Sequence, residues 1–184
     1  MKIKLLFALI LLAAITRLGL HLLPVPPHNF SPISAMGLFG AAYFSRRWMA
    51  AIVPFAALFL TDLVLNNVIY SQYYSGFAWI TSWWIYAAFG VVMLAGGLIL
   101  RNRVTPGRVV GASLSASVIF FLISNLSTFV DTNLYPHDFA GLLTCYTAAL
   151  PFFGNTVLGD LVFCALLFGM YEWMMHRPLQ TQKI

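Results

Sequence analysis

Six apolar runs follow one another along the chain, and they constrain its fold more than any other feature of the sequence. Hydrophobic residues make up 61% of the 184 positions and charged residues only 8%, too few to cover the surface of a soluble domain. The sequence therefore predicts an all-α membrane protein with six transmembrane helices in a single integral membrane domain, residues 1–184. The runs cover residues 4–23, 33–44, 48–66, 77–100, 109–130 and 144–175.

The first run begins MKIKLLFALILLAAI, a basic start and an apolar stretch of the kind found in secretory signals. Because no small-x-small cleavage pattern follows and the run continues to Leu23, we expect it to be retained as the first helix. Cys145 and Cys164 lie in one predicted helix, about 28 Å apart at the helical rise per residue, so they cannot pair with each other.

The second run, residues 33–44, is too short to cross a bilayer alone, since a dozen helical residues reach about 18 Å of a hydrocarbon core about 30 Å thick. The positive-inside rule nevertheless requires it to cross, because only then do nine basic residues all lie on one side. We therefore expect a multi-pass protein of the bacterial inner (cytoplasmic) membrane with both termini cytoplasmic. The nine are Lys2, Lys4, Arg46, Arg47, Arg101, Arg103, Arg108, Arg177 and Lys183.

The proline-rich segment Pro24–Pro32 must span the rest of the membrane thickness. It contains four prolines and favours extended backbone. Irregular backbone at membrane depth needs hydrogen-bond partners from protein or from a water-filled cavity. The sequence thus predicts a short second helix and a proline-rich embedded first loop that forms the lid or wall of a cavity on the outer side.

Four helices place their most polar residue at a similar height. Measured from the cytoplasmic ends of their helices, Arg17, Asp62, Asp160 and Asn125 lie about 20, 22, 24 and 26 Å into the membrane. Ionised groups at this depth are costly, usually face the bundle interior, and commonly mark functional sites. We expect a polar chamber that receives a solute. The alternative is a structural ion pair between Arg17 and either aspartate.

Three more residues complete the predicted substrate-binding site: His28 and Asn29 in the first loop and Asn155 in the last helix, which offer hydrogen bonds to a polar solute. Two histidines near the outer mouth, without a thiolate or carboxylate spaced beside them, make a poor metal site, so we predict no metal and no cofactor. The aromatic residues between Tyr70 and Trp84 are typical of an interfacial belt; the alternative is a stacking lid over a flat ring system.

A resemblance to known families rests on four segments: NFSPISAMGLFGAAYF (29–44), LTDLVL (60–65), SNLSTFV (124–130) and YPHDFAGLLTCYTAALPFFGNTVLGDLVFCALLFG (135–169). Over nearly its whole length the chain resembles an uncharacterised bacterial family of suspected transport proteins. In its six-helix architecture and the loop after helix one it also resembles the S components of energy-coupling factor (ECF) vitamin transporters.

The S-component resemblance implies an outer-side pocket for a vitamin or vitamin precursor, partly closed by Pro24–Pro32. It also implies a partner, a shared ATP-driven energising module. S components commonly carry an Ala-x-x-x-Ala docking pattern in helix one, whereas here Ala8 is followed four positions later by Leu12. Nickel and cobalt S components begin Met-His, whereas this chain begins Met1-Lys2, so we expect no uptake of a metal ion.

We therefore expect a substrate-binding membrane subunit or solitary carrier for a small organic solute, not an enzyme. The basic residues lie between apolar segments, which argues against a nucleic-acid partner. Two alternatives stay open. Asp62 and Asp160 could share a proton as the dyad of an intramembrane aspartyl protease, although the chain lacks a Pro-Ala-Leu element. The protein could also be a structural membrane subunit without a ligand.

Overall fold

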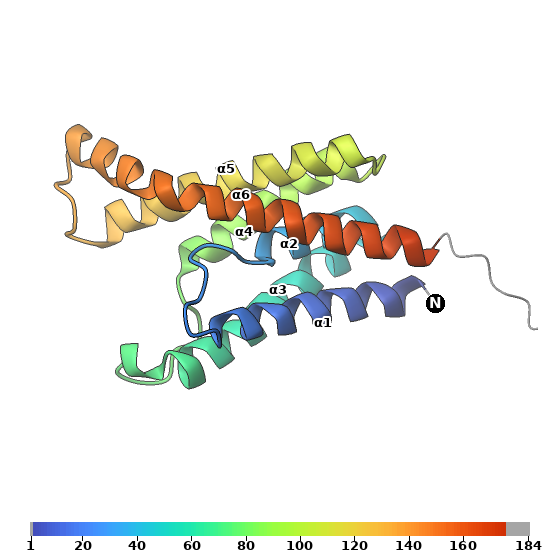
Figure 1. Ribbon diagram of the computed structural model, residues 1–184, viewed down its shortest axis with the longest axis horizontal. Helices are drawn as coiled ribbons and strands as arrows, with labels where there is room; N and C mark the ends of the chain where they lie inside the picture. Colours follow the sequence, from blue (N-terminus) through green and yellow to red (C-terminus); the bar gives the residue numbers. More distant parts are fainter. Residues whose placement is uncertain (1, 176–184) are drawn as a thin grey trace, which may run out of the picture.

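The computed structural model describes residues 2–175 and consists of helices joined by short connections (Figure 1). This confirms the predicted all-α fold with six helices. A short π-helix, η1 (Leu65–Ile69), and a 3-10 turn, η2 (Ser71–Tyr73), follow the third helix. The six helices are α1 (Lys2–His21), α2 (Ile33–Tyr43), α3 (Arg47–Val64), α4 (Trp83–Leu100), α5 (Pro106–Asp131) and α6 (Phe139–Met175).

Five of these segments are long and apolar enough to cross a membrane, and α2 is the shorter apolar helix. Many large apolar side chains on the outside of the bundle are exposed, among them Leu94 and Leu98 of α4 and Leu143 of α6. In a protein of this composition such side chains face lipid. The protein is therefore a multi-pass helical membrane protein.

The short helix α2 forms the centre of the bundle and packs against each of the other five helices. Every residue from Ile33 to Ala41 is buried, which fits a helix that is apolar on all sides. Its glycines allow this packing. A Cβ at Gly37 would lie 2.7 Å from the Phe89 ring, and one at Gly40 would lie 2.5 Å from the Pro54 ring.

Successive helices run in opposite directions, so the first loop and α2 together lead from the end of α1 to the start of α3 at the opposite end of the bundle (Figure 1). The start of α1, the α2–α3 and α4–α5 connections and the end of α6 consequently lie at one end, which we call the basic end. This is the arrangement that the charge pattern predicts. The basic-end residues that can be placed include Lys4, Arg46, Arg47, Arg101, Arg103 and Arg108; Arg177 and Lys183 lie outside the described residues.

The proline-rich first loop is embedded only in its second half. Leu22 to Val25 are exposed, whereas Pro32 is buried. Between them the loop packs on α6: the Phe30 ring lies 5.3 Å from the Phe163 ring, and a Cβ at Gly159 would lie 3.1 Å from the Ser31 amide nitrogen. The loop therefore lines α6 over part of its length.

Two helices begin at a different residue from the apolar run that predicts them, because a side chain before the helix caps its first turn. The fourth run begins at residue 77, but α4 begins at Trp83, where the Ser82 hydroxyl accepts a hydrogen bond from the Trp84 amide at 3.3 Å. The sixth run begins at residue 144, but α6 begins at Phe139, because the Asp138 carboxylate accepts from the Gly141 amide at 2.7 Å.

Candidate functional site

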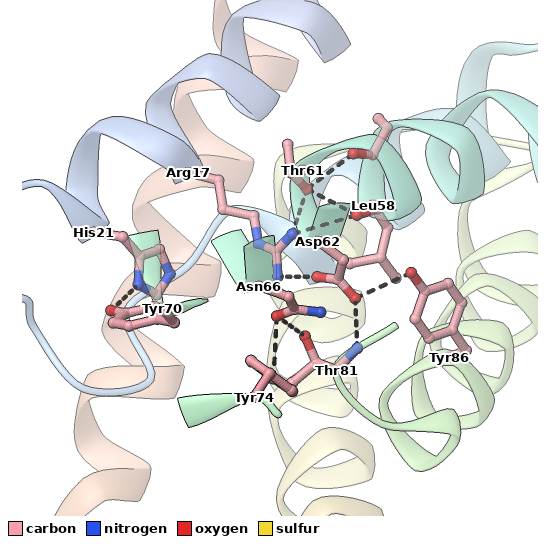
Figure 2. Close-up of polar contacts among 11 residues, drawn as sticks. Arg17, His21, Leu58, Thr61, Asp62, Asn66, Tyr70, Tyr74, Thr81 and Tyr86 are labelled. Atoms are coloured by element: carbon pink, nitrogen blue, oxygen red, sulfur yellow. Dashed lines mark hydrogen bonds and ion pairs between the residues drawn. The ribbon is translucent and has the colours of Figure 1, made fainter. Parts of the chain in front are cut away.

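A buried ion pair joins α1 to α3 (Figure 2). Both residues lie near the ends of their helices, in the half of the bundle away from the basic end. Arg17 Nη2 lies 2.7 Å from Asp62 Oδ1, and the Asp62 side chain is 0% exposed. Arg17 Nη1 donates to the Thr61 hydroxyl and, at 3.4 Å, to the Leu58 carbonyl oxygen. This contact is the ion pair that the sequence leaves open as the alternative to a polar chamber, and solute binding by Arg17 and Asp62 stays a prediction.

The second oxygen of the Asp62 carboxylate accepts two further hydrogen bonds. The Tyr86 hydroxyl of α4 donates at 3.0 Å, and the Thr81 amide, in the connection before α4, donates at 3.4 Å. Charge-assisted bonds of this kind are stronger than neutral ones. Asp62 therefore ties together α1, α3 and the start of α4.

Asn66 completes this network, one turn after Asp62 and inside the π-helix η1. Its Oδ1 accepts from the Tyr74 hydroxyl at 3.2 Å and from the Thr81 hydroxyl at 3.1 Å. The wider π-turn changes the direction of the side chains that follow it, and such turns are frequent at functional sites. Here the turn places a buried amide beside the ion pair (Figure 2).

Two donors of this network are buried yet have no hydrogen-bond partner among the described residues: Arg17 Nε and Asn66 Nδ2. Buried polar groups are rarely left unpaired in folded proteins, because the loss of hydration costs about 1–3 kcal/mol for each group. Two unpaired donors in one network are thus the most unusual feature of the site. They are the groups to which an acceptor on a bound molecule would bind.

The connection between α3 and α4 covers the site. Asn67 holds it in place, since its Nδ2 donates to the Ala78 carbonyl at 2.8 Å while its Oδ1 accepts from the Ala78 amide at 2.9 Å. At the end of α1, the His21 ring nitrogen Nδ1 lies 2.8 Å from the Tyr70 hydroxyl. Tyr70 and Tyr74 therefore have polar partners inside the protein, beyond what an interfacial belt requires.

Asp160 lies in a second polar cluster, formed by α2, α5 and α6. Its Oδ2 accepts from the Ser117 hydroxyl at 2.7 Å, and Ser34 is a further hydroxyl neighbour. Within residues 2–175 no basic side chain forms an ion pair with it. The two aspartates thus hydrogen-bond to separate sets of residues, which gives no support to a shared-proton dyad.

The other predicted site residues lie outside both networks. The Asn125 amide donates to the carbonyl oxygen of Phe121 in its own helix at 2.8 Å, and Asn155 is exposed on α6. Asn29 is exposed in the first loop with φ of 60°, and the His28 ring packs on Phe152 at 6.0 Å. Solute contacts by these four residues stay a prediction.

The sequence reasoning missed several residues of the Arg17–Asp62 network, chiefly Asn66, Thr81 and Tyr86. One signal was available for Asn66, because it follows Asp62 by four positions and so lies on the same helical face. Thr81 and Tyr86 come from another segment, and nothing in their spacing indicates a contact with Asp62. No group of metal-ligating residues is found in the described part of the chain.

With this geometry in hand, comparison with known proteins gives one finding. A family model described as "Family of unknown function (DUF6580)" matches residues 1–182. The chain belongs to this family. No curated protein and no solved structure matches it. The description of the family assigns no activity, so the function has to be argued from the site.

Proposed function

We propose that this member of the DUF6580 family is a substrate-binding membrane subunit, or a solitary carrier, for uptake of a small organic solute such as a vitamin or vitamin precursor. One observation carries the proposal: Arg17 Nε and Asn66 Nδ2 are buried in the Arg17–Asp62 network and have no hydrogen-bond partner within residues 2–175. Acceptor groups on a solute would satisfy these donors.

The charges narrow the chemistry of the solute. Asp62 already neutralises the guanidinium of Arg17 at 2.7 Å, so an added carboxylate would bring an uncompensated negative charge into a buried site. A neutral acceptor, such as an amide carbonyl or a ring nitrogen, carries no such penalty. The proposed solute therefore presents neutral acceptors to Arg17 and Asn66. Two tyrosine hydroxyls belong to the same network, that of Tyr74 bonded to Asn66 and that of Tyr86 bonded to Asp62.

A purely structural role is the main competing interpretation. An ion pair that only holds α1 against α3 accounts for the contact between Arg17 and Asp62. It does not account for the π-turn at Leu65–Ile69, nor for the two donors left without a partner. These features favour a ligand-binding site over an ion pair that only holds two helices together.

The energising partner is part of the same proposal. α1 presents an exposed apolar stripe that includes Ala8, Leu11, Leu12 and Ile15. An ATP-driven module that recognises helix one would bind this stripe. A solitary carrier would leave it to lipid. We place the protein in the bacterial inner membrane with the basic end cytoplasmic, which puts the Arg17–Asp62 network toward the outer side.

Native mass spectrometry of the protein purified from cells tests the proposal through a retained small molecule. Asn66→Ala and Arg17→Lys each remove one unpaired donor, and Arg17→Lys also keeps the positive charge beside Asp62. We expect the wild-type protein to carry the molecule and both variants to lose at least tenfold in occupancy, about 1.4 kcal/mol of binding free energy. The matched control is Thr156→Ala, which changes a buried polar residue of α6 outside the network.

Two outcomes would contradict the proposal. One is retention of the same molecule by both variants at wild-type occupancy. The other is a wild-type protein that carries no small molecule and gains no thermal stability from the small-molecule fraction of its own cells. The second outcome would favour the structural subunit.

A further inference from the structure

Asp160 is a buried carboxylate with no opposite charge beside it in the part of the chain that the structure describes. It is 2% exposed, its Oδ2 accepts from the Ser117 hydroxyl at 2.7 Å, and Ser34 of α2 is a second hydroxyl neighbour. Two neutral donors do not offset the cost of burying an ionised group inside a membrane. The site therefore needs a positive species that none of these neighbours provides.

The other titratable and charged groups near Asp160 do not neutralise it, among residues 2–175. α2 and α5 present the two hydroxyls, and in α6 the nearest titratable side chain is the Cys164 thiol, one turn further on. In α1 the guanidinium of Arg17 is bound to Asp62. In the first loop the His28 ring packs on α6 two turns before Asp160. Neutralisation is therefore left to a small mobile cation.

A cavity of about 350 Å³ between α5 and α6, which we call the α5–α6 cavity, reaches from the basic end toward this carboxylate. Residues 104–106 and Glu172 line it at the basic end, and Ser113 and Cys164 line it deeper in the bundle. Most of its wall is apolar, but Glu172 and Ser113 supply polar groups near its two ends. The volume far exceeds the roughly 10–15 Å³ that one water molecule requires.

The inner end of the α5–α6 cavity lies one helical turn from the hydrogen bond between Ser117 and Asp160. Ser113 precedes Ser117 by four residues and Cys164 follows Asp160 by four, so each pair shares a helix face over a rise of about 6 Å. Ser113 is 0% exposed, and its hydroxyl has no hydrogen-bond partner in the described chain. A hydroxyl both donates and accepts, so it can bind water at this end of the cavity.

We propose that Asp160 is a proton-binding site that exchanges its proton with the basic end through water in the α5–α6 cavity. The carboxylate takes one proton from this water and becomes a neutral acid, whose new O–H can donate to the Ser34 hydroxyl; release returns the proton to the water. A proton needs one acceptor, whereas hard metal cations take about six oxygen ligands. Coupling of this proton to solute uptake by a solitary carrier is the one step that rests on the proposed function.

Infrared spectroscopy of the full-length protein in liposomes tests the site without any solute, because a protonated carboxyl and a carboxylate absorb at different frequencies. We expect a protonated-carboxyl band that decreases as the pH is raised and that is absent from Asp160→Asn. The matched control is Arg17→Met/Asp62→Leu, which removes the other buried carboxylate together with its partner and should keep the band.

Transfer into D₂O tests the route, because the band shifts when deuterium replaces the proton. Gly169 lines the α5–α6 cavity, and we expect Gly169→Leu to slow this shift by about tenfold or more. Gly111→Leu is the control, since Gly111 of α5 has equally open space but does not line the cavity. The proposal is overturned if Asp160→Asn removes no band at any pH at which the protein stays folded, or if Gly169→Leu exchanges as fast as wild type. Either result leaves the solute proposal standing, because no solute is present.

Discussion

Asp62 and Asp160 are both buried in the bundle, yet their surroundings differ in kind. Asp62 is 0% exposed and is paired with Arg17, whereas Asp160 is 2% exposed and is held by the hydroxyl of Ser117. One carboxylate has a full opposite charge beside it, and the other has only neutral donors. Equal height on two helices therefore does not give two carboxylates the same kind of partner.

The two regions also differ in what covers them. The connection between α3 and α4 contributes Thr81 to the Asp62 network, whereas the proline-rich first loop packs through Phe30 and Ser31 on Gly159, next to Asp160. The loop that the sequence predicts as a lid thus contacts the Asp160 side of the bundle. The cover of the Arg17–Asp62 network comes from another part of the chain.

Of the variants that test the difference between the Asp62 and Asp160 regions, those that break the ion pair should change stability the most. Asp62→Ala leaves the guanidinium of Arg17 buried without an opposite charge, and removing one partner of a buried pair costs about 3–5 kcal/mol. We expect the free energy of unfolding in detergent to fall by this amount. The control is the double variant Arg17→Met/Asp62→Leu, which removes both charges and should recover most of the loss. A double variant as unstable as Asp62→Ala would contradict the assignment.

Packing of the first loop on the Asp160 side gives the next largest effect. A side chain at Gly159 would meet Ser31 and Phe30 at 3.1 to 3.2 Å, both backbone atoms, so the loop must move. Overpacking of this kind costs about 1–3 kcal/mol, and we expect Gly159→Leu to lower the melting temperature accordingly. Gly154→Leu, also in α6 but with open space around it, is the control. Equal melting temperatures for the two would place the loop elsewhere.

The hydrogen bond from Tyr86 to Asp62 offers a smaller test on the other side of the comparison. Bonds to charged groups contribute about 1.5–3 kcal/mol, so Tyr86→Phe should lower the free energy of unfolding by about 1.5 kcal/mol. Tyr73→Phe removes an exposed hydroxyl and should change it little. If both variants behaved alike, the bond from Tyr86 would not contribute to stability.

The sequence predicts the helices because a membrane span needs an apolar run, and because basic residues gather in the connections on one side of the membrane. It also places Arg17, Asp62 and Asp160 at one depth and leaves open an ion pair between Arg17 and either aspartate, since opposite charges at one depth lower their cost by pairing. Both expectations depend on distance along the membrane normal, which is read from residue counts at a fixed rise.

Rotation about each helix axis is not read in this way, so the sequence does not show which residues of equal height face one another. Asn125 and Asn155 have suitable heights, but one bonds to its own helix and the other is exposed. Asn66 and Thr81 belong to the network because of a π-turn and an irregular connection, neither of which changes the hydropathy of the sequence. The composition of the site therefore depends on local backbone geometry that the apolar pattern does not encode.

The last test makes the same substitution at each of the two carboxylates, and the smallest effect is expected at Asp160. Asp160→Asn keeps an oxygen that can accept the hydrogen bond from Ser117 and removes no charge from an ion pair, so it should change the free energy of unfolding by about 1 kcal/mol or less. Asp62→Asn, the same change, leaves the guanidinium of Arg17 uncompensated and should cost several times more. Denaturant titration of the two variants side by side measures the difference. Equal losses would mean that Asp160 also has a cationic partner, such as a bound ion, and the two regions would then be alike.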